Sequence, residues 1–484
     1  MKIRQEHRTP NAERRTPNAG LRPGLFDVRC SMLGVRRFPA QRGSVLIIVL
    51  WVAIGLVSIA LYFANTMTYE LRASDNRVSG LVADQAIEGA ARYVAYALQN
   101  FATNGAVPDN TQFKCAAVPV GDAKFWLIGR DPSGTPATEP YYGLVDEGGK
   151  LNLNNANTNV LSYLPGMTMD FADAIIDWRG TNGVVSLDYA TLGYLPKNAL
   201  LETVDELRLV YGATVDLLAG EDVNRNGVLD TNEKDLNSNG ELDPGLFEYV
   251  TVYTREPNFH ADGSSLTNVN STTQSQFSSL FQSAGTSSAT SMAQSIYRSI
   301  HPDPNNPRTV NNCNGLLDFA LRCKSAGMSS DDFNKIASNV TTSTNTYFRG
   351  RVNVNTACAD VLTALFMGRN VDEQTANAAA QTLITYRQQN PNNLISVAWI
   401  IDALGNNSPV ITALKNGDYV TTHSFQFTAD IAAVGPFGRG YRRVKFIFDM
   451  SDGSPKILYR QDLSRLGWAL GEKARQTLVA TDTQ

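Results

Sequence analysis

The residues with the clearest chemical pattern lie in one short acidic segment, 222–233. Oxygen-bearing side chains hold its first, third, fifth, ninth and twelfth positions, a glycine holds the sixth and the seventh can offer a main-chain carbonyl: Asp222, Asn224, Asn226, Gly227, Val228, Asp230 and Glu233. Ca²⁺ is a hard ion that takes six to eight oxygen ligands, and this spacing wraps them round one point. The segment therefore predicts a calcium loop.

A second, less complete copy follows directly. Its candidate ligands are Asp235, Asn237, Asn239, Glu241 and Asp243, with Gly240 at the turn. Leu246 occupies the twelfth position, where a bidentate glutamate belongs, so Glu248 or a residue from elsewhere in the chain must complete the site. The copies are too close together for EF-hand helices and resemble the tandem Asp-x-Asn-x-Asn-Gly repeats of extracellular calcium modules. A pair of Asx turns on a solvated loop is the alternative.

No enzyme constellation accompanies these loops in the sequence. The histidines have no metal-ligand spacing, and no nucleophile lies in a recognisable elbow or dyad. Acids such as Asp146, Glu147, Asp205 and Glu206 are expected to cap helices, lie on helix faces or form ion pairs. The chain is therefore not expected to be an enzyme.

A short hairpin raises the question of nucleic-acid binding. Residues 163–168 (YLPGMT) resemble the turn of a helix-hairpin-helix, but Thr168 replaces the second glycine and the duplicate at 365–369 lacks Pro-Gly. Residues 1–43 carry a net charge of +7, which leaves −11 for the rest of a chain whose total is −4. So acidic a domain binds polyanions poorly. A packing hairpin is expected, with DNA binding as the alternative.

An apolar run near the N-terminus predicts a membrane anchor for the domain that contains these loops. Arginines precede Gly43, and Ser44 then opens a stretch without charge until Glu70. Residues 45–64 reach the length of about 20 residues that crosses a bilayer as a helix. The run begins with Val45, Leu46, Ile47, Ile48, Val49, Leu50 and Trp51. The basic leader favours the cytoplasm, which places the following domain across the membrane after a single pass.

The boundary at Gly43 resembles the type III signal of type IV pilins and type II secretion pseudopilins, which a prepilin peptidase cleaves after glycine. The resemblance implies cleavage between Gly43 and Ser44. Most pilins carry Glu at the fifth mature position, which here is Ile48. A carboxylate in the bilayer core is costly unless it is partnered, and a subunit at a filament tip can dispense with it. In this respect the chain resembles the minor pseudopilin K family of type II secretion. A plain signal anchor is the alternative.

Four cysteines follow Gly43: Cys115, Cys313, Cys323 and Cys358. In an oxidising periplasm they permit disulfides, and Cys313 and Cys323 are the nearest pair. A continuous helix between these two would separate their Cα atoms by ~15 Å, too far for a bridge. Pairing would therefore require a turn within 312–315, and buried free thiols are an equally good interpretation.

The chain contains an internal duplication. Residues 149–156 (GKLNLNNA) reappear as 350–357 (GRVNVNTA), and 248–251 (EYVT) reappear as 418–421 (DYVT). Each unit predicts a short strand, helices capped by Asn and a closing strand. Between the units, residues 258–347 are rich in Ser, Thr, Asn and Gln and predict mostly loop, with helices only at 316–328 and 333–340.

The phrases LVDEGGKLNLNNAN, YVTVYTREPN and RVNVNTACADVL again resemble the K family, general secretion pathway protein K. The resemblance implies an α+β fold in which a pilin-like long N-terminal helix packs on an antiparallel sheet, with an inserted mainly helical domain. Strands of this sheet are expected at 124–128, 143–145, 247–253, 424–433 and 442–449.

The expected organisation begins with a cytoplasmic leader at 1–43, with Met32 as its suspected true start, and a transmembrane and amphipathic helix at 44–106. The remaining parts are the first pilin-like part (107–150), the first helical unit (151–220), the calcium-loop segment (221–246), a strand of the pilin-like domain (247–257), the polar insertion (258–347), the second helical unit (348–417) and the C-terminal strands and tail (418–484).

The resemblance implies a minor pseudopilin in the inner membrane, with its C-terminal domain in the periplasm. It would initiate or cap the type II secretion pseudopilus, which serves protein secretion across the outer membrane. Expected partners are I- and J-type minor pseudopilins through the N-terminal helix, prepilin peptidase and the inner membrane, with no nucleic acid. Ca²⁺ is the expected cofactor, in a structural role. The alternatives are a type IV pilus minor pilin and a membrane-anchored helix-hairpin-helix DNA-binding protein.

Overall fold

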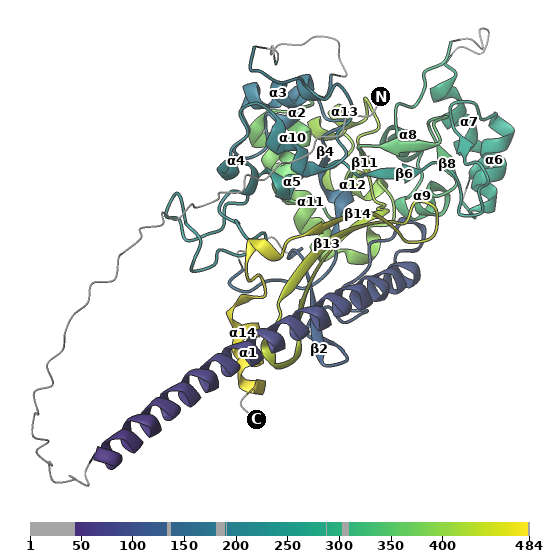
Figure 1. Ribbon diagram of the computed structural model, residues 1–484. Coiled ribbons are helices and arrows are strands. Elements are labelled where there is room, and N and C mark those ends of the chain that lie inside the picture. The colour runs from purple at the N-terminus through teal and green to yellow at the C-terminus, as the bar shows by residue number, and fades with distance from the viewer. Residues whose placement is uncertain are drawn as a thin grey trace, which may run out of the picture. The chain divides into compact units, whose positions relative to one another are not determined.

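The computed structural model describes residues 44–132, 137–180, 189, 191–286, 288–302 and 309–482. The expected leader, with Gly43 at its end, lies outside the described residues. The chain divides into two units, 1–69 and 70–484, which are described in turn. Helix α1 (Ser44–Phe101) begins in the first unit and ends in the second (Figure 1).

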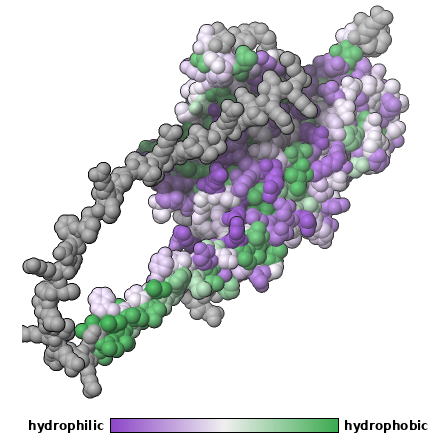
Figure 2. All heavy atoms as spheres, viewed as in Figure 1, coloured by the Kyte–Doolittle hydropathy of each residue, from purple (hydrophilic) through white to green (hydrophobic). Residues whose placement is uncertain are grey.

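The described part of the first unit is the N-terminal stretch of α1. Its side chains from residue 45 to 69 are exposed, and those of the expected membrane-helix residues Val45 to Trp51 are 57–76% exposed. Figure 2 shows this apolar surface. The hydroxyls of Thr66 and Thr68 donate to main-chain carbonyls one turn earlier, so they need no outside partner. Within the described residues, α1 is the one helix long and apolar enough to cross a membrane.

In the second unit, the later part of α1 packs on an antiparallel sheet. The strand order is β1-β2-β12-β13-β14, with β3 paired to β12. The strands are β1 (Val118–Val120), β2 (Ala123–Ile128), β3 (Val145–Asp146), β12 (Gln426–Val434), β13 (Arg442–Asp449) and β14 (Lys456–Asp462). Apolar residues of α1 at helical spacing, from Ala83 to Leu98, join Phe125, Leu127 and Phe427 in one core. The predicted α+β fold, with a long helix on an antiparallel sheet, is confirmed.

The C-terminal segment covers the other face of this sheet. Trp126 and Ile128 of β2 point away from α1 and pack with Ala469, Leu470 and Leu478. Leu478 belongs to α14 (Gly471–Asp482), which follows β14. Because alternate residues of a strand face opposite sides, β2 can supply both cores.

The expected sheet strand at 247–257 is wrong. Residues Leu246–Tyr249 form helix α5, and the rest of the segment contains two short strands, of which Val250–Thr251 is β5. β5 pairs in parallel with β4 (Leu151–Asn152) outside the main sheet, and β6 (Arg255–Pro257) pairs with β9 (Tyr347–Arg349). Runs of two or three strand residues carry too little alternation to reveal their partner.

The predicted duplication corresponds to two matching units, repeat A (residues 151–251) and repeat C (352–421). In repeat A, β4 pairs in parallel with β5; in repeat C, β10 (Val352–Asn353) pairs in parallel with β11 (Val420–Thr421). The buried Arg179 and Arg387 donate to main-chain carbonyls at matching positions, 153 and 156 in repeat A and 354 and 357 in repeat C. The helices of repeat A are α2 (Thr158–Leu161), α3 (Met169–Arg179), η3 (Val204–Leu209), α4 (Val215–Ala219) and α5. Those of repeat C are α10 (Ala359–Met367), α11 (Glu373–Gln389), η4 (Pro391–Asn393), α12 (Ala398–Leu404) and α13 (Pro409–Leu414).

The polar insertion contains a third copy, repeat B (267–341), which corrects the expectation of a mostly irregular segment. Its strands β7 (Thr267–Asn268) and β8 (Val340–Thr341) pair in parallel as in A and C. Its helices are α6 (Gln274–Ser283), α7 (Ala289–Ile300), α8 (Leu316–Ser325) and α9 (Ser330–Ala337). The expected helices at 316–328 and 333–340 correspond to α8 and α9, but α6 and α7 were not foreseen.

One asparagine contact identifies the three copies as the same unit. The Asn154 side chain accepts a hydrogen bond from the Leu201 N–H (2.8 Å) and donates to the Leu201 carbonyl (2.9 Å). Asn270 makes the same pair of bonds to Cys313 (2.7 and 3.1 Å), and Asn355 donates to the Leu394 carbonyl (2.9 Å). In each repeat this asparagine, two residues after the first strand, ties that strand to the segment after the second helix.

We expect Asn270→Ala to loosen repeat B, because the substitution removes the partners of the Cys313 main chain. Loss of these hydrogen bonds should cost about 2 kcal/mol. Hydrogen exchange across 267–341 in the full chain measures the effect, and Asn154→Ala should loosen repeat A in the same way. Asn407→Ala, at an exposed position of repeat C, is the control. If the amides of residues 267–341 exchange as slowly in Asn270→Ala as in the control, the contact does not hold the repeat together.

Candidate metal site

The calcium-loop segment is inserted between α4 and α5 of repeat A, and its two ends are joined. The Glu221 N–H donates to the Asp243 carbonyl (3.0 Å), and the Gly245 N–H donates to the Ala219 carbonyl (3.1 Å). Gly220 has φ +64°, and a Cβ there would lie 2.4 Å from the Gly245 nitrogen. Only glycine therefore fits this neck, which holds residues 221–244 as a closed loop.

The first loop brings its predicted side chains together. The Asp222 carboxylate accepts the N–H groups of Asn226 and Gly227, both at 2.8 Å. The Glu233 carboxylate reaches back to accept the N–H groups of Asn224 (3.0 Å) and Asp230 (3.1 Å). The loop therefore closes on itself from its first to its twelfth position. Gly227, with φ +82°, makes the predicted turn.

Two features of the first loop fit a calcium ion. The Oδ1 atom of Asn224 is buried without a hydrogen-bond partner in the described structure, which is costly unless something else binds it. Burial also raises the pKa of Asp222, although Arg130 opposes this, and burial raises the pKa of Glu233. A cation at the loop would stabilise the charged form of both carboxyls.

The described residues contain no group of three or more His, Cys, Asp or Glu side chains placed to hold a metal. A calcium loop does not need such a group, because Ca²⁺ also accepts amide and main-chain carbonyl oxygens. Here Asn224, Asn226 and the Val228 carbonyl would supply part of the set.

Glu221, a residue outside the second loop, contacts that loop, whereas Glu248 binds Arg130. The buried Glu221 carboxylate accepts the N–H groups of Leu236 (2.5 Å) and Asp243 (3.0 Å), as Glu233 accepts two N–H groups in the first loop. The Asp235 carboxylate accepts the Gly240 N–H (2.8 Å) and so matches Asp222. Because Glu221 precedes both loops, the twelve-residue spacing rule could not find it. Asn237, Asn239 and Glu241 lie on this loop, which is largely exposed.

Glu248 instead forms an ion pair behind the first loop. The Arg130 Nε atom donates to its carboxylate at 2.9 Å, and the same guanidinium lies 3.8 Å from Asp222. Burial would raise the pKa of Glu248, yet Arg130 holds it below its usual value. Arg130 thus takes the carboxylate that the second loop was expected to use.

The first loop is fastened to the sheet and to the C-terminal segment. The fully buried Arg443 of β13 donates to the main-chain carbonyls of Asn224 and Arg225 and forms an ion pair with Asp430 at 2.6 Å. The Asn224 amide also donates to the Trp468 carbonyl at 3.3 Å. A conformational change in the first loop would therefore alter its contacts with the sheet and with the C-terminal segment that covers the sheet.

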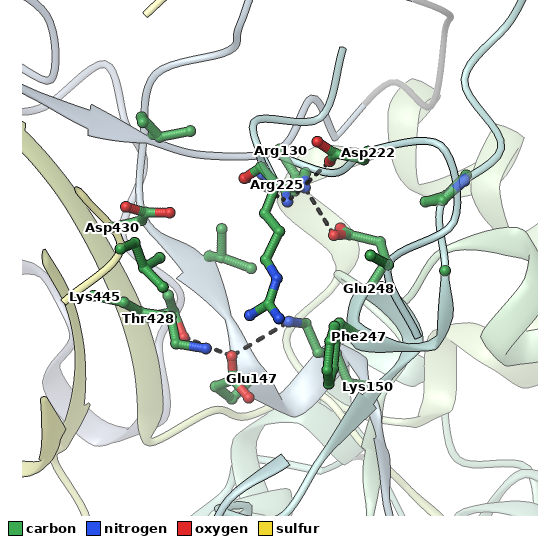
Figure 3. A pocket seen from close by; sticks show the side chains of 16 residues that line it. Arg130, Glu147, Lys150, Asp222, Arg225, Phe247, Glu248, Thr428, Asp430 and Lys445 are labelled. Atoms are coloured by element: carbon green, nitrogen blue, oxygen red, sulfur yellow. Dashed lines mark hydrogen bonds and ion pairs between the residues drawn. The ribbon is translucent and has the colours of Figure 1, made fainter. Parts of the chain in front are cut away.

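A charged cavity of about 70 Å³ lies beside this attachment. Figure 3 shows Arg130 with Asp222 and Glu248 on one side of it and Glu147 with Lys150 on the other. The Arg225 side chain extends between them, stacked 4.0 Å from the centre of the Phe247 ring. Acidic and basic groups alternate round the cavity, so each charge has an opposite neighbour.

Asp146 and Glu147, which the sequence suggested only as caps, helix-face residues or ion-pair partners, join the sheet to the repeats. Glu147 is buried and accepts hydrogen bonds from Thr251 of repeat A and from Thr428 of β12 (2.6 Å). Asp146 accepts bonds from Asn353 (3.0 Å) and from three further groups: Thr356, Ser424 and the Gly148 N–H. The adjacent glycines at 148 and 149 permit the close approach: a Cβ at 148 would lie 2.1 Å from the Ser424 hydroxyl.

The other predicted site residues have simple surroundings. Ser44 is the first residue of α1. Thr168 caps α3 through its hydroxyl, which accepts the Phe171 N–H at 3.2 Å. Cys313 and Cys323 are both buried thiols.

Comparison with known proteins gives little beyond this geometry. No protein family matches the chain, and no curated protein matches it. Among solved structures, the GspK-GspI-GspJ complex from the enterotoxigenic Escherichia coli Type 2 Secretion System is similar, at 15% identity over 43% of this chain and 78% of that chain, with a TM-score of 0.17. At that TM-score the likeness carries no weight beside the residues themselves.

We expect Glu147→Gln to destabilise the second unit by about 2 kcal/mol at pH 7, since it removes a buried charge from its partners. Burial alone would raise the pKa of Glu147, but Lys150 and two threonine hydroxyls hold it below its usual value. A lowered pKa in the folded state stabilises the protein above the unfolded-state pKa of about 4.3, and this contribution disappears as the pH falls through the lower, folded value.

The difference in the free energy of unfolding between wild type and Glu147→Gln should therefore have its full size at pH 7 and decrease below about pH 4. Urea unfolding of the full chain in detergent, at pH 7 and at a pH below about 4, measures this difference. Glu70→Gln, on an exposed part of α1, controls for the loss of one negative charge. A difference that is the same at both pH values would contradict the assigned role.

Proposed function

We propose that the chain is a minor pseudopilin of the K family, acting at the tip of a type II secretion pseudopilus. The observation that carries the proposal is α1, a single helix that begins at Ser44, exposes apolar residues through 45–64 and packs on an antiparallel sheet from Ala83 onward. Such a helix can lie among the helices of sister subunits while its later part supports a folded domain. The helical repeats that interrupt the sheet domain are the K-like feature.

The proposed path begins in the inner membrane. Prepilin peptidase cleaves between Gly43 and Ser44 and leaves the apolar stretch on the mature protein, with the second unit in the periplasm. Ile48 is apolar and 60% exposed, so the fifth mature position offers no carboxylate to a subunit above. This suits a subunit that initiates or caps the filament, with I- and J-type minor pseudopilins as its neighbours.

We also propose that Ca²⁺ binds the first loop and, more weakly, the second. Asp222, Asn224, Asn226, Asp230 and Glu233 would hold the first ion with the Val228 carbonyl. Asp235, Asn237, Asn239, Asp243 and Glu221 would hold the second, with Glu241 contributing its carbonyl. The ions stabilise negative charge gathered on one segment. The burial of the first loop and the exposure of the second support the order of affinity.

The helix proposal predicts specific neighbours for α1. A photo-crosslinker at Val57, 58% exposed, should capture other minor pseudopilins in intact membranes. The same crosslinker at Asn407, exposed on repeat C, is the control and should not capture the same set. N-terminal sequencing of the same material should begin at Ser44. Products that contain type IV pilus subunits instead would assign the chain to a pilus, and crosslinks to neither class would overturn the proposal.

The calcium proposal predicts protection of the loop segment from trypsin. Lys234 lies exposed between the loops, so cleavage there reports their opening. Calcium at 100 times its Kd should lower the open population about a hundredfold. Glu233→Gln should abolish protection by the first loop and Glu221→Gln should weaken only the second, whereas Glu248→Gln, which touches the Arg130 ion pair, should leave calcium dependence intact. Equal cleavage with calcium and with chelator would refute both sites.

A further inference from the structure

Two thiols of repeat B lie in one buried place. Cys313 is 3% exposed and precedes α8, while Cys323 is 0% exposed and lies within α8. Both belong to the apolar core that also contains Phe319 and Phe333. They are separated by ten positions in the sequence, and a straight helix would keep them apart, but α8 begins only at Leu316.

The chain before α8 folds back against the helix. Arg322, the residue before Cys323, donates to the carbonyls of Asn311 (2.8 Å) and Asn312 (3.2 Å), the two residues before Cys313. Asp318 holds the Arg322 guanidinium at 3.0 Å. The expected separation of about 15 Å for a continuous helix therefore does not apply, because α8 begins only at Leu316 and the carbonyls of 311 and 312 are held at the Arg322 guanidinium.

The position of Cys313 is fixed by its main chain. Asn270 binds both its N–H and its carbonyl, as Asn154 binds Leu201 in repeat A. In repeat C the matching residue is Leu394. Repeats A and C thus place leucine where repeat B places cysteine, and repeat B is the copy with the most polar sequence. A covalent link would compensate for a small apolar core.

We propose that Cys313 and Cys323 form a disulfide that closes repeat B. Formation joins the two Sγ atoms, removes both thiol protons and passes two electrons to an exchangeable disulfide of a thiol–disulfide oxidoreductase, which becomes a dithiol. The inference rests on the proposed function only for the oxidising compartment in which the second unit lies.

Burial decides when the bond forms. It raises the pKa of Cys313 to about 12 and that of Cys323 well above its usual value, and the neighbouring Cys313 raises the latter further. Only the thiolate attacks a disulfide, so the folded repeat exchanges slowly. The bond therefore forms while the repeat is still open, and the closed core then shields it from reductants.

Mass spectrometry of the full chain tests the proposal. The mature protein is isolated from membranes, unfolded in urea without reductant and alkylated. Two alkyl groups are expected, on Cys115 and Cys358, with a linked peptide containing Cys313 and Cys323 that is lighter by two hydrogen atoms than its reduced form. Alkylation after reduction should label all four.

Variants separate this bond from other pairings. Cys313→Ala should free Cys323 for alkylation and leave the labelling of Cys115 and Cys358 unchanged, and Cys115→Ala is the matched control that should leave the linked peptide intact. Four labelled thiols without reductant, or a link from either cysteine to Cys115 or Cys358, would overturn the inference. Protease access to the second unit in spheroplasts is measured alongside: an accessible unit with four free thiols refutes the disulfide while leaving the proposed function standing.

Discussion

Two adjacent carboxylates, Asp146 and Glu147, hold the sheet to the helical repeats. Glu147 bonds to β12 on one side and to Thr251 of repeat A on the other, while Asp146 bonds to Asn353 of repeat C. A buried carboxylate without partners would be expensive, so these side chains require both repeats and the sheet to be in place at once. The two glycines that follow leave room for the close approach. One short segment thereby sets where the repeats lie on the sheet.

The three repeats share one arrangement of strands and helices and differ mainly in the segments that connect these elements. Each copy closes a parallel pair of two-residue strands over four or five helical segments of the described chain. Each copy also uses an asparagine to fix the chain after the second helix. Repeat A accommodates the loop segment 221–244 between α4 and α5. Repeat B enters and leaves through the paired strands β6 and β9, which bring the ends of a long insertion together. Loop-closure entropy rises slowly with length, so such insertions are tolerated.

The first loop is more than a surface turn, because it is held from three directions. Arg443 binds its carbonyls from β13, Arg130 lies against Asp222, and the Trp468 carbonyl accepts the Asn224 amide. The second loop has fewer attachments and depends on Glu221 at the shared neck. This difference in burial gives the two loops different stiffness, and ligand rigidity is one of the quantities that tune calcium affinity.

Local patterns in the sequence predicted several parts correctly. These parts are the apolar periodicity of α1, the alternating strands β2, β12 and β13, the turn at 222–227 and the relation of repeats A and C. All of them depend on neighbours along the chain. About half of the candidate metal site, the first loop, could be read in this way, because its ligands follow one another in a fixed order.

Only the tertiary structure decided the rest. Repeat B could have been suspected from Asn268-Val269-Asn270 and Val340-Thr341, yet its polar helices hide the pattern, and Arg298, at the position that matches Arg179 and Arg387, is exposed. Three features depend on residues far away in the sequence. They are the contact of Glu221 with the second loop, the pairing of Val250–Thr251 with β4, and the bonds of Asp146 and Glu147 to the repeats. Spacing along a chain specifies contacts within a turn or a loop, whereas contacts between distant segments exist only once packing has brought those segments together.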